Sequence, residues 1–435
     1  MKMKDYLAKD DKIISQVYER DPIVISGGEG IFLYDTNGKK YYDFTAQYSA
    51  CSLGHNHRGL NEAINKQLSK LVSVSTQFAT EERIALAERL ISLNNGYYKK
   101  VFLGVTGSDA NEFVLKAAKY YKKGGNIISL WRGFHGVTAG VAAATGKAET
   151  IQIDPNISSL LPSGFSHVSP PYCYRCDYKK EYPNCDLFCI DFIKTKIAND
   201  GIDNIAAIII EPILSGGGII IPPSGYIKAL KKLCEDINAL LIFDEIVTGC
   251  GRTGSFFAYQ HWGVYPDILV LGKSLTGGYI PGSAVLMTDE VGKTMDDLIL
   301  HGHTHSAYPL MCASAIKNLE VIEKEKLYDN AARIGNIMIK RLKKMMEKYS
   351  YIGDIRGKGL LIGIEIVKDN ESREADHQMA CKLYFNLLDA GIKTELKSFP
   401  RLESSVIAIT PPLIINEKEA CEALDIMEVV FNKHG

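Results

Sequence analysis

Short apolar runs alternate with longer amphipathic segments through the middle of the chain. The apolar runs lie at 101–105, 127–131, 205–210, 239–243 and 268–271. Segments with the apolar spacing of a helix separate some of them, as at 109–122 and 225–235. Strands that alternate with helices are typical of a mainly parallel sheet covered on both faces. The pattern therefore predicts an α/β fold in this part of the chain.

The two ends of the chain have a different pattern. Residues 31–45 contain two β-rich runs around Asn37-Gly38, which predicts a hairpin. Toward the C-terminus the pattern predicts one long helix over 313–350, a strand over 359–367 and a helix over 378–390. These elements favour a smaller α+β unit beside the large α/β one. The predicted divisions are a large domain over 56–310, a small C-terminal domain over 311–435 and an N-terminal segment, 1–55, that joins the small domain.

Composition then excludes several classes of partner. The 435 residues include 50 Lys and Arg against 51 Asp and Glu, a formal net charge of -1, so no basic footprint for nucleic acid is expected. No apolar run approaches the ~18–20 residues that span a bilayer. The charged N-terminus also lacks the apolar stretch of a signal peptide. We therefore expect a cytoplasmic protein that binds neither nucleic acid nor a membrane.

Residues that could bind a ligand follow the first two predicted strands. Ligands gather at the carboxyl ends of the strands in such a sheet. Gly107 and Ser108 open a helix, whose free N–H groups could bind a phosphate. The alternative is a plain helix cap by Ser108 or Asp109. Phe134 lies between two glycines and could stack on a planar ligand, or could simply close the core.

Two carboxylates and a lysine follow the next three strands. Glu211 and Asp244 need partners if they are buried, and Asp244 could face a protonated ring nitrogen or form an ordinary salt bridge or helix cap. Lys273 could snorkel to the surface. A desolvated lysine, however, loses its proton more easily and can form a Schiff base with a carbonyl. Together, a phosphate cradle, a stacking aromatic, an acid and a lysine meet the needs of pyridoxal phosphate (PLP).

Longer motifs carry a family resemblance. The segments TGSDANE, GFHG, LLIFDEIVTGCGRTG and LGKSLTGGYIPGSA, together with HGHTHSAYPLMCASA and ITPPLII, resemble class III PLP-dependent aminotransferases. The resemblance covers nearly the whole chain. It implies fold type I: a large domain with a mainly parallel sheet flanked by helices, and a smaller α+β C-terminal domain.

The resemblance implies a role for individual residues. Lys273 is the Schiff-base lysine and proton shuttle, and Asp244 pairs with the pyridine nitrogen. Phe134 and Ile246 lie on the two faces of the ring, although the family usually has Tyr or Trp at position 134. Thr304 reaches the phosphate of the neighbouring subunit, which implies a homodimer with shared active sites. The implied cofactor contacts are Gly107, Ser108, Phe134, His135, Glu211, Asp244, Ile246, Val247, Lys273 and Thr304.

Departures from the family pattern concern the substrate. Val247 stands where ornithine- and 4-aminobutyrate-type enzymes have a glutamine. Ala408 stands where many members have an arginine that clamps a carboxylate, a contact that a methyl group cannot replace. Arg401 lies ten residues before Pro411, similar to the mobile arginine of amine–pyruvate enzymes, or it is a variable surface loop residue. Tyr48 and Arg401 are the candidate substrate contacts.

Three functions remain after this comparison. The leading hypothesis is an aminotransferase that moves an amino group from an amine or ω-amino acid to a keto acid such as pyruvate, by a ping-pong mechanism. The second is a related PLP reaction, either epimerisation or the dialkylglycine decarboxylase reaction. Tyr48, Gly216 and Ala408 argue against the decarboxylase, which is expected to have Gln, Ser and Arg there. The third is a non-catalytic binding protein on this scaffold.

The sequence also contains clusters of cysteine and histidine. Cys173, Cys176, Cys185 and Cys189 have the spacing C-x2-C-x8-C-x3-C, which suits either a structural zinc or a cysteine-rich loop. The proposed function needs no metal, and none is assigned to the site. The remaining candidates, expected to shape the substrate pocket or a subunit interface rather than bind a metal, are His55, His57, His301, His303 and His305.

Overall fold

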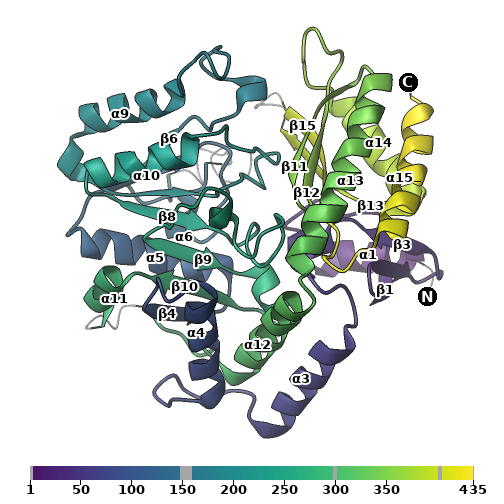
Figure 1. Cartoon of the computed structure of the whole chain (residues 1–435). Coiled ribbons are helices and arrows are strands. Elements are labelled where there is room, and N and C mark those ends of the chain that lie inside the picture. The colour runs from purple at the N-terminus through teal and green to yellow at the C-terminus, as the bar shows by residue number, and fades with distance from the viewer. Residues whose placement is uncertain (1–2, 147–158, 297–300, 400–403, 435) are drawn as a thin grey trace.

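The computed structural model describes residues 3–146, 159–296, 301–399 and 404–434. A seven-stranded sheet with the order β4-β10-β9-β8-β7-β5-β6 organises the middle of the chain (Figure 1). Five neighbouring strands run parallel, and β10 runs antiparallel to both β4 and β9. The strands are β4 (Lys100–Gly104), β5 (Asn126–Leu130), β6 (Phe165–Val168), β7 (Ile205–Ile210), β8 (Leu240–Asp244), β9 (Ile268–Leu271) and β10 (Ser283–Met287).

Both faces of this sheet are buried. Along β8, Leu240 and Ile242 belong to one hydrophobic cluster, and Leu241 and Phe243 belong to another, as expected when successive side chains point to opposite faces. This explains why its strands appear in the sequence as continuous apolar runs. The first cluster includes α5 (Gly107–Tyr121), α6 (Ala139–Ala142) and α11 (Asp289–Met295). The second includes α4 (Glu81–Leu93), α9 (Phe188–Asp200), α10 (Tyr226–Asp236) and α12 (Pro309–Lys324).

Two smaller sheets lie beside the large one. An antiparallel sheet of order β11-β12-β15-β14 packs against α13 and α14, and α15 packs against these two helices (Figure 1). Its strands are β11 (Ile352–Lys358), β12 (Leu361–Ile366), β15 (Ser404–Ile409) and β14 (Glu395–Phe399). The helices are α13 (Leu327–Lys348), α14 (His377–Asp389) and α15 (Glu417–Asn432). The predicted α+β character of the C-terminal part is therefore confirmed.

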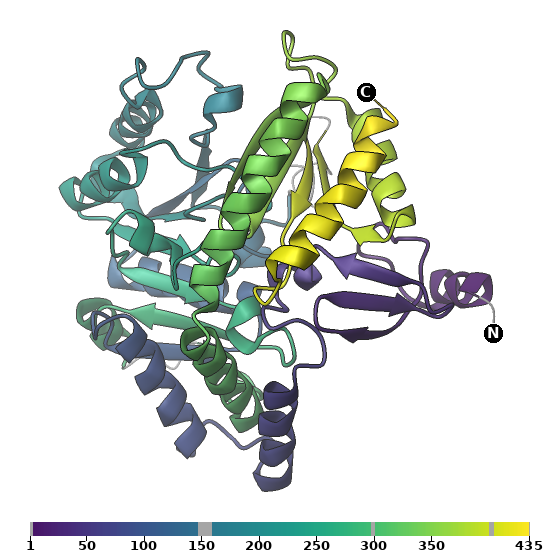
Figure 2. The ribbon, with the colours of Figure 1, turned by 45° about the vertical axis from the view of Figure 1, so that its right-hand side comes forward.

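The N-terminal hairpin joins the C-terminal part of the chain. Its sheet has the order β1-β2-β3-β13, in which the C-terminal strand β13 (Ile392–Lys393) pairs in parallel with β3 (Lys40–Asp43). Figure 2 shows these N-terminal strands beside α15. The other members are β1 (Ile25–Glu29) and β2 (Phe32–Asp35), preceded by α1 (Met3–Ile13); α2 (Ala46–Ser49) and α3 (Arg58–Lys70) follow. The domain boundaries at 55 and 310 stay a prediction.

Two features differ from the sequence-based expectation. The single helix predicted over 313–350 is wrong: α12 ends at Lys324 and α13 begins at Leu327. Lys326 between them adopts a left-handed backbone with φ 49°, and no glycine or proline marks this break in the sequence. The antiparallel strand β10 was also not expected. Among the described residues, no helix is both long and apolar enough to cross a membrane.

Candidate active site

A cavity of about 330 Å³ lies where the strands of the large sheet end. This volume falls within the range of small-molecule sites. Residues at or just after the ends of β4, β5, β7, β8 and β9 contribute to its wall, as the sequence predicted. The predicted residues that line it are Tyr48, Gly107, Ser108, Phe134, His135, Glu211, Asp244, Ile246, Val247 and Lys273.

The N-terminus of α5 forms one side of the cavity. Thr106 caps the helix, with its hydroxyl accepting from the Asp109 N–H at 3.1 Å, so the predicted capping by Ser108 or Asp109 is wrong. The Ser108 hydroxyl instead accepts from the Val137 N–H at 3.1 Å. A Cβ on Gly107 would lie only 2.7 Å from Cδ1 of Ile246. Glycine therefore keeps the helix N-terminus open toward the cavity.

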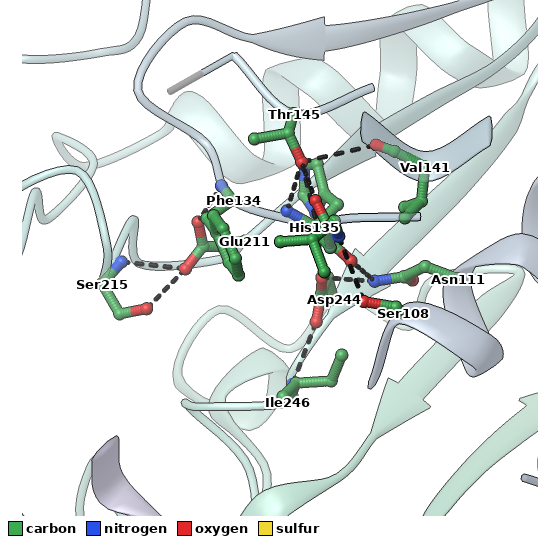
Figure 3. A network of polar contacts seen from close by, with 12 residues as sticks. Ser108, Asn111, Phe134, His135, Val141, Thr145, Glu211, Ser215, Asp244 and Ile246 are labelled. Carbon is green, nitrogen blue, oxygen red and sulfur yellow. Dashed lines mark hydrogen bonds and ion pairs between the residues drawn. The ribbon is translucent and has the colours of Figure 1, made fainter. Parts of the chain in front are cut away.

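Asp244 is held rigidly at the end of β8. It is 3% exposed, and its Oδ2 atom contacts both the Asn111 amide nitrogen at 2.8 Å and His135 Nδ1 at 2.9 Å (Figure 3). The Ile246 N–H donates to Oδ1 at 3.1 Å. These contacts stabilise the charged carboxylate in a buried place. Asp244 is thus buried and pairs with His135, and its role toward a ring nitrogen stays a prediction.

Asn111 and His135 position Asp244. The Asn111 amide also donates to the backbone carbonyl of His135 at 2.7 Å, so the three residues form one unit (Figure 3). Sequence reasoning did not single out Asn111. The spacing within TGSDANE could have indicated it. Asn111 lies four residues after Gly107 on the helix, so the two residues share the face that points toward the cavity.

Glu211 fixes the loop that carries the aromatic residue. Its Oε1 accepts from the Phe134 N–H at 2.9 Å, and its Oε2 accepts from the Ser215 N–H at 2.9 Å and hydroxyl at 2.5 Å (Figure 3). The structure therefore gives Glu211 the partners that a buried carboxylate needs. Phe134 is half-buried and lines the cavity, so it does not merely close the core.

Lys273 follows β9 and lines the cavity. Its backbone is left-handed with φ 45°, an uncommon conformation for lysine that tends to be kept at functional sites. Burial lowers the pKa of its amine; Glu395 acts to raise that pKa, and Lys397 acts to lower it. The net direction is downward. An amine with a lowered pKa is more available as a nucleophile and proton carrier.

Glu395 and Lys397 also line the cavity, from β14. Sequence reasoning missed both, because a charged residue in a short strand looks like a solvated one. Tyr48 lines the cavity with a half-exposed ring and a left-handed backbone. Ala408 is fully buried in an apolar cluster on β15, so it offers no polar group there. Arg401 lies outside the described residues.

The comparisons with known proteins agree with this geometry. The family model for aminotransferase class III matches residues 13–431. The acetylornithine aminotransferase of Methanocaldococcus jannaschii is 35% identical over all of this chain and 99% of its own. The leucine/methionine racemase of Thermococcus litoralis is 34% identical over 94% of this chain and 90% of its own.

The chain belongs to the class III aminotransferases. A solved amine transaminase from an uncultivated Pseudomonas species, in the PLP-bound (internal aldimine) form, superposes with a TM-score of 0.90 at 30% identity, covering 97% of this chain and 98% of its own. This aminotransferase therefore has the fold type I architecture, and PLP is its cofactor. The hypothesis of a non-catalytic scaffold is wrong.

The cavity of this aminotransferase fits PLP. The N-terminus of α5, left open by Gly107, suits the phosphate. The buried carboxylate of Asp244 suits a protonated pyridine nitrogen, because Asn111 and His135 already hold it in place. The Lys273 amine lies in the same cavity. When bound, PLP supplies an electron sink for the substrate carbon.

Thr304 lies outside this cavity. It is exposed, and its neighbour His303 contacts Asp109 Oδ1 through Nε2 at 2.6 Å, as His301 does at 2.7 Å. These contacts tie the loop of Thr304 to the first turn of α5. The ligand atoms of Asp109, His301 and His303 lie within 4.8 Å of one another, and no other such group is found among the described residues.

The remaining clusters stand apart from the site. His55 contacts Asp43 and His57 caps α3, and a place at a subunit interface stays a prediction for all five histidines. None of the five lies among the residues that line the cavity. The four thiols of the cysteine-rich segment are free and at least partly exposed, and no three of them gather closely enough to form a ligand group in the described structure. The four are Cys173, Cys176, Cys185 and Cys189.

Proposed function

We propose that this aminotransferase moves an amino group from an amine or ω-amino acid donor to a keto acid such as pyruvate, in two half-reactions at one site. The observation that carries the proposal is the joint presence of Lys273 and the positioned Asp244 in one cavity. Similarity to the amine transaminase supports the donor class.

Each residue then has a step. The Lys273 amine would hold the cofactor. Once free of it, the amine would act as the base that takes the proton from the carbon bearing the donor's amino group, and its ammonium would give that proton back when the amino group is transferred. Its lowered pKa favours this use as a base. The Asp244 carboxylate would face the cofactor's ring nitrogen, while Glu211 fixes the loop that carries Phe134 in the cavity wall.

The walls of the cavity favour an apolar donor. Ile219, Val247 and Leu361 line it, and Ala408 packs behind Ile219 and Leu361. No cation comes from the Ala408 position to clamp an α-carboxylate. A donor with an apolar substituent next to its amino group gains free energy from these surfaces.

A second candidate function has its own support. The similarity to the leucine/methionine racemase favours epimerisation as the alternative. Lys273 would serve that reaction too, because it also begins with removal of a proton from the carbon that bears the amino group. The decarboxylase reaction has no comparable support among these relatives.

Product analysis separates these reactions. The holoenzyme is incubated with pyruvate and, in turn, 1-phenylethylamine, β-alanine, L-leucine and 2-methylalanine, and the products are resolved by chiral chromatography. Alanine formed from pyruvate with the first two donors supports the proposal. Racemised leucine without alanine would establish epimerisation and overturn the proposal. Carbon dioxide released from 2-methylalanine as the main product would also overturn the proposal, in favour of the decarboxylase reaction.

We also propose a homodimer in which Thr304 of one subunit completes the cofactor site of the other. The exposed place of Thr304, outside the cavity of its own chain, supports this arrangement. Light scattering at micromolar concentration tests it directly. A monomer of 48.1 kDa with full cofactor affinity would contradict it.

A further inference from the structure

Two opposite charges lie together in the wall of the cavity. Glu395 and Lys397 both line it, and the Lys397 ammonium donates to Glu395 Oε1 at 2.6 Å. They are two residues apart on β14, so their side chains point to the same face of the strand. The Lys397 side chain is 9% exposed and that of Glu395 is 23% exposed.

The pair faces the place where substrate must lie. Glu395 is paired in register with Ala408 on β15, and Lys397 with Val406. Ala408 packs with Ile219 and Leu361, which line the cavity. The pair also acts electrostatically on the Lys273 amine, so its charges reach the reacting end of the cavity.

Lys397 has a distinctive place among the charges of the site. Of the described residues that line the cavity, the lysines and arginines are Lys273 and Lys397. Lys273 is assigned to the cofactor in the proposed function. The carboxylates of Glu211 and Asp244 have backbone and side-chain partners that keep them in place. Among the described residues that line the cavity, Lys397 is therefore the cation left for a substrate carboxylate.

A buried ion pair is a poor way to stabilise a fold. Taking two charges from water costs free energy that their attraction only partly returns, and an apolar pair of the same size is often as stable. In a ligand cavity the same pair has another use. A carboxylate that arrives can take up the ammonium in a charge-assisted hydrogen bond, and the pair re-forms when it leaves.

We propose that Lys397 binds the carboxylate of the keto-acid acceptor, and that Glu395 competes for its ammonium and so limits how tightly that carboxylate is held. This assignment rests on the proposed aminotransferase function and extends it to the second substrate. With a carboxylate-free amine in the cavity, the Lys397–Glu395 pair stays intact. With the acceptor bound, Glu395 gives up Lys397 and its negative charge disfavours the complex.

The test compares the two half-reactions of the holoenzyme. For Lys397→Met we expect kcat/KM for pyruvate to fall about 10- to 100-fold, the equivalent of one charge-assisted hydrogen bond. The kcat/KM for 1-phenylethylamine, which has no carboxylate, stays within about twofold. Butanone, a carbonyl acceptor without a carboxylate, is used equally well by both enzymes. Lys397→Arg, which keeps the cation, retains most of the pyruvate activity.

Glu395→Gln is expected to change the binding of pyruvate in the opposite direction to Lys397→Met. Without its charge the competition for Lys397 weakens, so the KM for pyruvate falls while kcat does not rise in proportion. This variant does not depend on whether Lys397→Met folds. The matched control is Lys393→Met on β13, which removes the same charge from a lysine paired with Asp21 outside the cavity, and leaves the pyruvate KM unchanged.

A binding measurement separates this proposal from the reaction itself. Propanoate has the carboxylate of pyruvate but no ketone, so its dissociation constant can be measured by calorimetry on the holoenzyme. Weaker binding in Lys397→Met, but not in Lys393→Met, supports the assignment even if no transamination is found. If Lys397→Met binds propanoate like the wild type, or loses pyruvate, butanone and amine activity equally, the assignment is overturned.

Discussion

A buried carboxylate outside the active site allows a sharp test of what holds the structure together. Glu365 on β12 is fully buried and accepts hydrogen bonds from Arg356 at 2.7 Å, Arg175 at 2.9 Å and the Tyr172 hydroxyl at 2.7 Å. Arg356 also donates to the backbone carbonyls of Gly218 and Ile219, beside the cavity. Glu365 therefore links three separate parts of the chain.

Glu365→Gln removes the buried counter-charge of Arg175 and one of the two carboxylates that pair with Arg356, which keeps Asp354 at 3.0 Å. Removing one partner of a buried ion pair costs about 3–5 kcal/mol, because the remaining charge stays desolvated. The control is Glu428→Gln on α15, which removes a carboxylate that also has two cationic partners, Arg341 and Lys348, but lies at the surface. Exposed pairs contribute about 0–1 kcal/mol.

The assay is urea unfolding of the holoenzyme at fixed PLP, followed by both tryptophan fluorescence and circular dichroism. Coincident transitions validate the extrapolated free energy of unfolding. We expect Glu365→Gln to lose several times more stability than Glu428→Gln. Equal losses in the two variants would refute the argument from burial.

The same carboxylate predicts a pH dependence. Burial acts to raise the pKa of Glu365, but Arg356 and Arg175 outweigh it, and the pKa is lowered. A carboxyl group whose pKa is lower in the folded state contributes stability above its unfolded value and loses it as the pH falls through the folded value. The stability gap between wild type and Glu365→Gln should therefore shrink in acid. A gap that widens as the pH falls would contradict the assignment.

The other predictions concern the site. Asp244→Asn keeps the shape but removes the anion, so PLP still binds while kcat falls by at least about 100-fold, measured by steady-state kinetics with added PLP; unchanged kcat would contradict the role. Glu211→Gln leaves the Phe134 loop with weaker acceptors, and we expect about 10-fold weaker PLP affinity in a fluorescence titration; affinity equal to the wild type would count against this positioning. Thr304→Ala should also weaken PLP binding without changing the oligomer seen by light scattering, and loss of the oligomer alone would point to a purely structural contact.

The large sheet was predictable because its strands are buried on both faces. Such strands appear as short apolar runs, and 205–210, for example, is fully buried in the structure. The strands β6 and β10 were not predicted: β6 is only partly buried, and no local pattern marks the antiparallel direction of β10. The break at Lys326 was missed because a left-handed lysine depends on tertiary packing rather than on a turn residue.

The cofactor side of the site was predictable for a similar reason. Asp244 ends β8, Glu211 and Lys273 lie just after β7 and β9, and the carboxyl ends of parallel strands meet at one edge of the sheet. Glu395 and Lys397 reach the cavity through the pairing of β14 with β15, which brings together residues that no local pattern connects. The substrate side of the site therefore needed the structure.

The visible absorption spectrum of the holoenzyme tests the central claim most directly. Wild type and Lys273→Ala are loaded with PLP, then given 1-phenylethylamine and, after it, pyruvate. We expect a yellow band in the wild type that fades with the amine and returns with pyruvate, and no such cycle in Lys273→Ala. A band that persists in the wild type through every addition, or an equal cycle in Lys273→Ala, would contradict the account.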